Sequence, residues 1–133
     1  MNIKIGIDII EIDRIKKAIK KHKKFLSRNF SEQENEYFST NENVIQTVAG
    51  NFAAKEAFSK SIGTGIRGFS LIDIEILRNK NKKPILLLKK KIQNCDLSIT
   101  HSKENAIAVV IYRKNFLKHV FNLFFYNIFH LIF

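Results

Sequence analysis

The sequence predicts an α+β fold in which an antiparallel sheet packs against a long central helix. Three observations favour it: isoleucines alternate near the N-terminus, a long segment in the middle has helical spacing, and several strand-like segments follow with connections of hairpin length. Strands joined by such short connections pair antiparallel. The order of one strand, several helices and then strands is typical of an α+β arrangement.

The first predicted strand covers residues 3–10, IKIGIDII. Its two faces consist of Ile3, Ile5, Ile7 and Ile9 on one side and Lys4, Gly6 and Asp8 on the other. Successive side chains of a strand point to opposite faces, so this alternation indicates a strand with one buried face. We expect the isoleucines to form the buried face and Asp8 to point away from it.

A strongly basic helical segment is predicted next, over residues 13–30. Apolar residues near helical spacing form one face, and basic residues recur every three or four positions on another: Ile15, Ile19 and Leu26 against Arg14, Lys17, Lys21, Lys24 and Arg28. Ser31 with Glu34 three residues later is a capping-box pattern, which predicts a further short helix.

The main helix is predicted over residues 44–61 and is followed by three glycines, Gly63, Gly65 and Gly68. Their G-x-G-x-x-G spacing matches a dinucleotide-binding fingerprint, but that motif requires a strand before the glycines and a helix after them. Here the order is reversed. We therefore expect Gly63 to end the helix in a left-handed conformation and the other two glycines to form the turn into a strand.

The remaining predicted strands cover residues 69–77, 84–88, 97–101 and 106–112. Residues 1–114 are expected to form one domain, because 133 residues suffice for a single core. Residues 115–133 form a hydrophobic extension that is barely long enough to reach across a bilayer and contains Asn122, Asn127 and His130. The sequence leaves open a packed helix, a membrane-surface helix or a poorly ordered extension.

Composition restricts the partners and the compartment. Lys and Arg number 23 against 12 Asp and Glu, a net charge of +11, which favours nucleic acid, an anionic membrane, a phosphorylated ligand or an acidic protein. Cys95 is the only cysteine, which excludes an intramolecular disulfide and a cysteine cluster for zinc. The first residues lack the features of a signal peptide, so we expect a cytoplasmic protein.

Two carboxylates and a lysine are the strongest candidates for chemistry. Glu56 and Lys60 are four residues apart and share a face of the main helix, an arrangement that is usually an exposed ion pair. Small residues before them, the glycine turn after them and Asp8 beside Gly6–Ile7 favour a functional site instead. Mg²⁺ commonly binds one or two protein carboxylates and completes its shell with water and substrate phosphate oxygens.

A predicted strand ends at His101 and Ser102. A histidine at a strand end is commonly a surface residue. Beside a basic, glycine-rich site it is also a candidate to donate a hydrogen bond to a phosphate group.

Three segments in this order and spacing, GIDIIEIDRI, FAAKEAFSKSIGTG and SITHSKENAIA, resemble the small bacterial holo-acyl-carrier-protein synthases, which are 4'-phosphopantetheinyl transferases. The resemblance covers about residues 3–113. It implies a phosphopantetheinyl transferase-like fold and a homotrimer with active sites between subunits. It also implies transfer of the phosphopantetheine arm of coenzyme A to a serine of apo acyl carrier protein, with release of adenosine 3',5'-bisphosphate, for fatty acid biosynthesis.

The resemblance also implies roles for individual residues. Asp8 and Glu56 match the family's Mg²⁺ carboxylates, and Lys60 matches the lysine near the diphosphate. Ile10 stands where larger single-chain relatives have a third carboxylate, which leaves room for a metal-bound water. Either that water or Glu56 would take the proton of the serine, and the sequence leaves both open. The expected coenzyme A contacts are Lys60, Gly63, Gly65, His101 and Ser102.

The resemblance also implies a role for the basic segment in binding the carrier protein, because acyl carrier proteins present an acidic helix beside their serine. The expected carrier-protein surface consists of Arg14, Lys17, Lys21, Lys24 and the apolar anchor Phe25. The alternative is a merely solvated basic face. Two departures affect the coenzyme A contacts: Asn51 stands where relatives often have arginine or another large residue, and Asn105 where tyrosine is common.

Two rival functions follow from charge and from the tail. A small nucleic-acid-binding protein would explain the net charge and the basic helix, but it leaves Asp8 and Glu56 without a role, because carboxylates repel phosphate unless a cation lies between them. A membrane-surface protein would depend only on the tail and the basic residues. We therefore expect coenzyme A and acyl carrier protein as partners and no nucleic acid.

Overall fold

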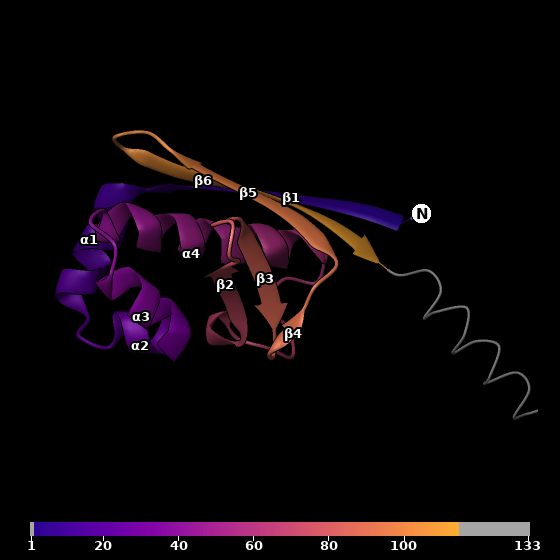
Figure 1. Cartoon of the computed structure of the whole chain (residues 1–133), viewed down its shortest axis with the longest axis horizontal. Helices are drawn as coiled ribbons and strands as arrows, with labels where there is room; N and C mark the ends of the chain where they lie inside the picture. Colours follow the sequence, from indigo (N-terminus) through magenta and orange to yellow (C-terminus); the bar gives the residue numbers. More distant parts are fainter. Residues whose placement is uncertain (1, 115–133) are drawn as a thin grey trace, which may run out of the picture.

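The computed structural model describes residues 2–114, which form the predicted α+β fold (Figure 1). The hydrophobic extension over residues 115–133 lies outside the described residues. In chain order the elements are β1 (Asn2–Glu11), α1 (Ile12–Lys21), α2 (Phe25–Asn29), α3 (Glu32–Ser39), α4 (Val44–Ser61), the 3-10 helix η1 (Leu71–Asp73), β2 (Ile74–Arg78), β3 (Pro84–Leu88), β4 (Lys91–Ile92), β5 (Cys95–His101) and β6 (Asn105–Lys114).

The strands form two antiparallel sheets, with the orders β1-β6-β5 and β2-β3-β4. Helix α4 runs along the first sheet, and helices α1 to α3 gather at one end of it (Figure 1). Asp8 of β1 pairs with Ala108 of β6 in this sheet. The second sheet packs against the other side of the long helix, so α4 is the central element that the sequence predicted. No helix in the described segment has the length and hydrophobicity needed to span a bilayer.

The buried face of β1 is the opposite of the predicted one. The isoleucine face is exposed to solvent in the single chain, with relative exposures of 46% for Ile3, 67% for Ile5, 57% for Ile7 and 61% for Ile9. The other face of the strand packs on α4, where a Cβ at Gly6 would lie 1.8 Å from the carbonyl oxygen of Ala57. Alternation predicts a strand but not which face meets the helix, and here the small residue determines it.

The prediction of one basic helix over residues 13–30 is also wrong in one respect, because this segment is divided into the two helices α1 and α2. His22 ends α1 in an extended conformation with φ −122° and ψ 100°. The break redirects the chain so that the Phe25 ring lies 6.1 Å from the ring of Phe52 on α4 and 6.3 Å from that of Phe30. Aromatic packing on the core therefore overrides the continuous helical pattern.

The later segments follow the sequence closely, with two differences. Residues 69–77 begin with η1 before strand β2, because the Asp73 carboxylate accepts hydrogen bonds from the backbone and hydroxyl of Ser70. The two-residue strand β4 was not predicted. Gly63, Gly65 and Gly68 adopt positive φ values of 76°, 63° and 77°, which confirms the predicted left-handed turn after α4.

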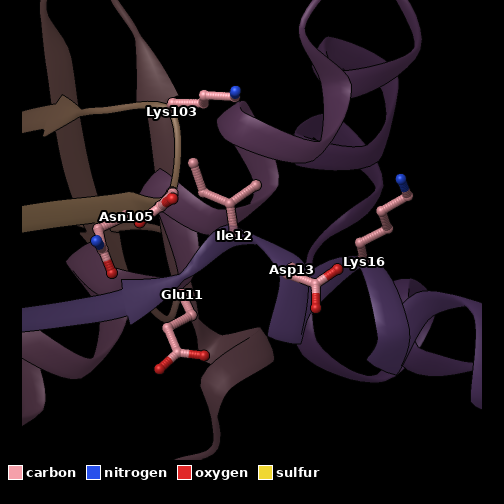
Figure 2. A pocket seen from close by; sticks show the side chains of 7 residues that line it. Glu11, Ile12, Asp13, Lys16, Lys103 and Asn105 are labelled. Carbon is pink, nitrogen blue, oxygen red and sulfur yellow. The ribbon is translucent and has the colours of Figure 1, made fainter.

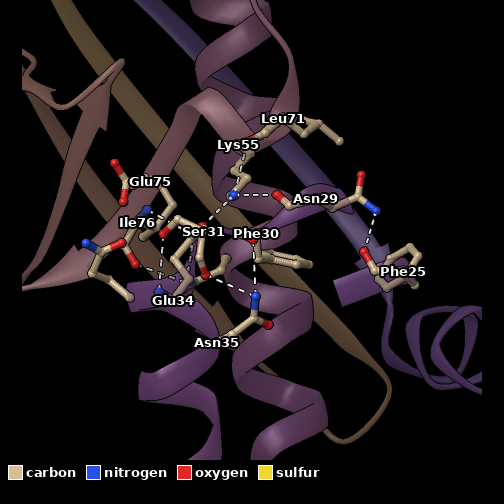
Figure 3. A network of polar contacts seen from close by, with 12 residues as sticks. Phe25, Asn29, Phe30, Ser31, Glu34, Asn35, Lys55, Leu71, Glu75 and Ile76 are labelled. Carbon is tan, nitrogen blue, oxygen red and sulfur yellow. Dashed lines mark hydrogen bonds and ion pairs between the residues drawn. The ribbon is translucent and has the colours of Figure 1, made fainter. Parts of the chain in front are cut away.

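A buried polar network joins the small helices to α4 (Figure 3). Lys55 Nζ lies 2.7 Å from a carboxylate oxygen of Glu34, and both side chains are fully buried. Lys55 also donates to the carbonyl oxygens of Asn29 and Leu71, while Glu34 accepts backbone hydrogen bonds from Ser31 and Ile76. The Ser31–Glu34 contacts are the capping box that the sequence predicted. The network fixes α2, α3 and β2 on the helix that carries Glu56.

Candidate active site

Asp8 and Lys60 meet where β1 crosses the last turns of α4. Lys60 Nζ donates to Asp8 Oδ1 at 2.7 Å and to the Ile7 carbonyl oxygen at 3.1 Å. The Asp8 side chain is only 16% exposed, whereas that of Lys60 is 55% exposed. The ammonium group is therefore held at one end by the strand while it still faces solvent, which suits a group that binds an anion.

Glu56 lies one turn before Lys60 and shares a cavity of about 550 Å³ with Asp8. Burial raises the pKa of Glu56, the Asp8 charge raises it further, and Lys60 lowers it. In the described part of the chain the Glu56 carboxylate makes no hydrogen bond or ion pair. The cavity thus contains the half-buried Glu56 carboxylate, which has no direct ion pair within residues 2–114 and interacts with the positive charge of Lys60 only at longer range.

The wall of this cavity opposite the carboxylates comes from α1, α2 and the break between them. Of the predicted carrier-protein residues, Arg14 and Phe25 line it, and His22 and Phe52 line it as well. His22 and Phe52 were not predicted as site residues, because only the break after α1 and the packing of Phe25 on α4 bring them to the cavity.

The other predicted carrier-protein residues lie on the adjoining surface. Lys17, Lys21 and Lys24 are exposed and do not line the cavity, and Lys17 forms an exposed ion pair with Asp13 at 2.7 Å. Of the predicted basic residues, Arg14 therefore lines the cavity, and the others lie outside it along α1 and the connection to α2.

The glycine turn follows Lys60 directly. A Cβ at Gly63 would have only the Lys4 ammonium nearby, at 3.9 Å, and one at Gly65 would have nothing within 4 Å. Since no other group of residues 2–114 fills the space beside these two glycines, their backbone is open there to a ligand that approaches Lys60.

His101 and Ser102 are not brought together with the carboxylates. His101 lines a different cavity of about 470 Å³, beside Gln46, Thr47 and Gly50 of α4. These helix residues lie on the side of α4 away from Phe52 and Glu56, so the helix separates the two cavities. The Ser102 hydroxyl accepts the backbone N–H groups of Glu104 and Asn105 and so shapes the β5–β6 turn.

A third cavity lies where β1 joins α1, next to the β5–β6 turn (Figure 2). Figure 2 shows Lys103 and Asn105 on the turn side and Asp13 and Lys16 on the helix side. It contains none of the predicted catalytic or coenzyme A residues. Asn105 therefore lies away from Asp8 and Glu56 within the single chain.

The donor set at Asp8 and Glu56 fits a hard divalent cation. Both groups are carboxylates in one cavity. Burial chiefly, and the Asp8 charge in addition, raise the pKa of Glu56, and a cation beside the two carboxylates would favour their charged forms. Among the described residues no group of three or more His, Cys, Asp or Glu side chains could hold a metal. A cation here would therefore take its remaining ligands from water and substrate, as Mg²⁺ commonly does.

Comparison with known proteins identifies the family of the chain. A family model described as the 4'-phosphopantetheinyl transferase superfamily matches residues 4–111. The holo-[acyl-carrier-protein] synthase of Clostridium beijerinckii is 52% identical over 119 residues, covering 84% of this chain and 97% of the relative. That of Clostridium botulinum is 49% identical over 115 residues, covering 80% and 94%.

Solved structures give the same result. A holo-(acyl-carrier-protein) synthase from Bacillus anthracis in complex with CoA (3',5'-ADP) superposes with a TM-score of 0.71 at 43% identity, covering 81% of this chain and 93% of the other. The Helicobacter pylori holo-[acyl-carrier-protein] synthase in complex with coenzyme A has a TM-score of 0.71 at 38% identity, covering 80% and 96%. The family model over residues 4–111 and the identity to these relatives show that the chain belongs to the 4'-phosphopantetheinyl transferase superfamily.

Proposed function

We propose that this protein is a holo-acyl-carrier-protein synthase, which transfers the 4'-phosphopantetheine group of coenzyme A to a serine of apo acyl carrier protein for fatty acid biosynthesis. The observation that carries the proposal is the cavity that Asp8 and Glu56 line together with Arg14 and Phe25, with Lys60 bound to Asp8. The similar proteins named above carry this activity in their names.

In the proposed reaction the serine oxygen forms a bond to the phosphorus that carries the pantetheine arm. The bond from this phosphorus to the bridging oxygen breaks, and adenosine 3',5'-bisphosphate leaves with that oxygen and its electron pair. The serine proton is released. Lys60 lies at the edge of the cavity and would stabilise the charge that develops on the diphosphate, a role that requires the ammonium to be fixed before reaction.

Asp8 and Glu56 would hold Mg²⁺ in this enzyme. When bound, the ion would neutralise diphosphate charge as a Lewis acid. Asp8 keeps one oxygen free of Lys60, whose hydrogen bond goes to Oδ1, and Glu56 contributes a carboxylate without a partner in residues 2–114. The two carboxylates therefore form a negatively charged site for a cation, and the positive charge of Lys60 reduces the net negative charge of that site.

The basic surface around the entrance would bind the carrier protein. Arg14 and Phe25 both line the cavity, and Phe25 packs on Phe52, so a serine that reaches the carboxylates would bring the carrier protein close to them. The exposed residues Lys17, Lys21 and Lys24 extend the positive surface along the same segment. Complementary charge of this kind increases the rate of encounter and fixes orientation.

The exposed face of β1 supports assembly as a homotrimer. Four isoleucines in a row leave an apolar surface of a kind that monomers rarely expose, and the outward side chains of the paired strand β6 continue it: Ile107, Val109 and Ile111. Assembly would also explain the separate position of His101. Since α4 divides the two cavities within one chain, a coenzyme A molecule that touches both Asp8 and His101 would lie between subunits.

The coenzyme A contacts proposed here are Lys60, the open turn at Gly63 and Gly65, and His101 with the neighbouring Ser102 turn. Mixing two inactive variants tests their assignment to different subunits. In equimolar mixtures of Asp8→Asn and His101→Ala protein, reassembled after dissociation, about one site in four would combine intact residues from two chains, and transfer should reappear. Recovery no greater than the sum of the separate variants would place both residues in one chain.

Transfer of labelled phosphopantetheine from coenzyme A to purified apo acyl carrier protein tests the function. We expect label on the wild-type carrier in the presence of Mg²⁺ and none on a carrier whose acceptor serine is changed to alanine. Absence of label with the wild-type carrier would exclude the proposal. Binding to duplex DNA or RNA under the same ionic conditions would then favour the nucleic-acid alternative.

A further inference from the structure

The ammonium group of Lys60 makes two contacts of different kinds. It donates to Asp8 Oδ1 at 2.7 Å and to the main-chain carbonyl oxygen of Ile7 at 3.1 Å. The carbonyl is neutral and is held in place by strand β1, whereas the Asp8 carboxylate is charged and is one of the two groups proposed to bind a cation. An ammonium has three N–H donors, so Lys60 keeps one donor beyond its two contacts within residues 2–114.

The contact with Asp8 makes Lys60 a competitor of any other cation at this carboxylate. The Asp8 side chain is 16% exposed and that of Lys60 is 55% exposed, so water screens the pair only in part. A divalent cation that binds Asp8 must either displace the ammonium or lie beside a like charge. Both reduce the affinity of the cation for the protein.

Lys60 also acts on the second carboxylate of the cavity. Glu56 precedes it by one turn of α4 and has no hydrogen bond or ion pair of its own within residues 2–114. Burial and the Asp8 charge raise the pKa of Glu56, and the charge of Lys60 is the influence that lowers it. One lysine thus compensates both carboxylates, Asp8 by direct contact and Glu56 at longer range.

We infer that Lys60 is the counter-ion of the two carboxylates and exchanges Asp8 for the diphosphate when coenzyme A binds, so that the protein binds a divalent cation weakly alone and tightly together with coenzyme A. This inference depends on the proposed function for the identity of the substrate and of the cation site. The Ile7 carbonyl would keep the ammonium at the edge of the cavity during the exchange, so Lys60 changes one partner and stays in place. The exchange leaves both Asp8 oxygens available to the cation.

Lys4 is a second lysine near this site and provides the matched control. It lies four residues before Asp8 on the same face of β1, and its ammonium donates to the Ile62 carbonyl oxygen at 3.4 Å. Within residues 2–114 it forms no ion pair with a carboxylate. Four residues of a strand span about 13 Å, which exceeds the distance of about 8 Å over which physiological salt screens a charge. Removal of the Lys4 charge should therefore affect Asp8 little.

Binding of Mn²⁺ to the full chain, followed by electron paramagnetic resonance at physiological salt, tests the inference without requiring transfer. Mn²⁺ prefers the same carboxylate and water ligands as Mg²⁺. Without coenzyme A, Lys60→Met should bind Mn²⁺ about three- to tenfold more tightly than wild type, because the competing ammonium is gone. Lys60→Arg keeps the charge and should bind Mn²⁺ within about twofold of wild type, as should Lys4→Met.

The second measurement repeats these titrations with saturating coenzyme A and no carrier protein. In wild type, coenzyme A should strengthen Mn²⁺ binding both by its own oxygens and by removing Lys60 from Asp8. In Lys60→Met only the first contribution remains. The factor by which coenzyme A strengthens Mn²⁺ binding should therefore be at least about threefold smaller in Lys60→Met than in wild type.

Unchanged or weaker Mn²⁺ binding by Lys60→Met without coenzyme A would overturn the inference, and so would an equal gain in Lys4→Met, which would indicate a general effect of charge. Damage to the fold cannot imitate the expected result, because a disordered site binds a cation less tightly. The transfer assay on the same preparations separates the two claims. A wild-type protein that shows the expected Mn²⁺ binding but transfers nothing to the carrier would contradict the proposed function alone, and one that transfers while Lys60→Met leaves Mn²⁺ binding unchanged would contradict only the inference.

Discussion

Gly6 allows β1 to approach α4 closely enough for Asp8, two residues further on, to reach Lys60. An added Cβ would lie 1.8 Å from the Ala57 carbonyl oxygen and 2.8 Å from the Ser61 nitrogen, both backbone atoms that cannot rotate away. Restoring an ordinary contact of 3.4 Å requires the strand to move by about 1.6 Å. Gly6→Ala should therefore destabilise the fold by about 3 kcal/mol, the upper part of the usual range for overpacking.

The same displacement should disrupt the site. Asp8 would move relative to Glu56 and Lys60, and misplacement of about 1 Å in a catalytic group can reduce the rate about 100-fold. Urea unfolding followed by circular dichroism measures the stability, and transfer below the unfolding transition measures the activity.

Gly50→Ala is the control for this prediction. Its Cβ would lie 2.8 Å from the Ile99 Cγ2 methyl group, a side-chain atom rather than a backbone atom, and the helix gains from the loss of a glycine, so Gly50→Ala should destabilise the fold less than Gly6→Ala does. A Gly6→Ala protein as stable and as active as wild type would refute the proposed role of the close approach.

Three further predictions follow from the network, the carboxylates and the basic surface. Glu34→Gln should cost about 3–5 kcal/mol in urea unfolding, because it leaves the Lys55 ammonium buried without its countercharge; a loss below about 1 kcal/mol would contradict this. Because the pKa of Glu56 is raised in the folded state, its contribution to stability is present at low pH and is lost as the pH rises, so Glu56→Gln should melt higher than wild type at pH 7. This difference should vanish below pH of about 4, and a lower melting temperature at pH 7 would oppose the argument. Arg14→Glu or Lys24→Glu should raise the KM for acyl carrier protein far more than that for coenzyme A, and equal effects would place these residues elsewhere.

The central helix and the first strand were predictable from the sequence because each depends on local spacing, whereas the periodic basic segment is interrupted after α1. The central helix α4 coincides with the predicted residues 44–61, and β1 extends the predicted strand by one residue at each end. The buried face of β1 was not predictable, because isoleucines favour burial whether the partner is the chain's own core or another subunit. The fit of Gly6 against Ala57 determined which face packs on α4.

The residues of the candidate site also fall into those that the sequence identifies and those that only the tertiary structure reveals. Glu56 and Lys60 share a helix face at a spacing of four, and the alternation of β1 separates Asp8 from the isoleucines, so these three could be identified from the sequence. His22 and Phe52 could not, because each depends on a tertiary event: the break after α1 and the packing of Phe25 on α4. Neither event has a local sequence signal.

The central role of the two carboxylates is tested most directly by the transfer rates of Asp8→Asn and Glu56→Gln proteins. Each change removes one negative charge from the cavity at nearly constant volume, so folded protein should persist. With saturating coenzyme A and carrier protein at ordinary Mg²⁺ concentration, each variant should transfer phosphopantetheine at least about 100-fold more slowly than wild type. A wild-type rate in either variant would contradict the assignment of Asp8 and Glu56 as a joint cation and diphosphate site.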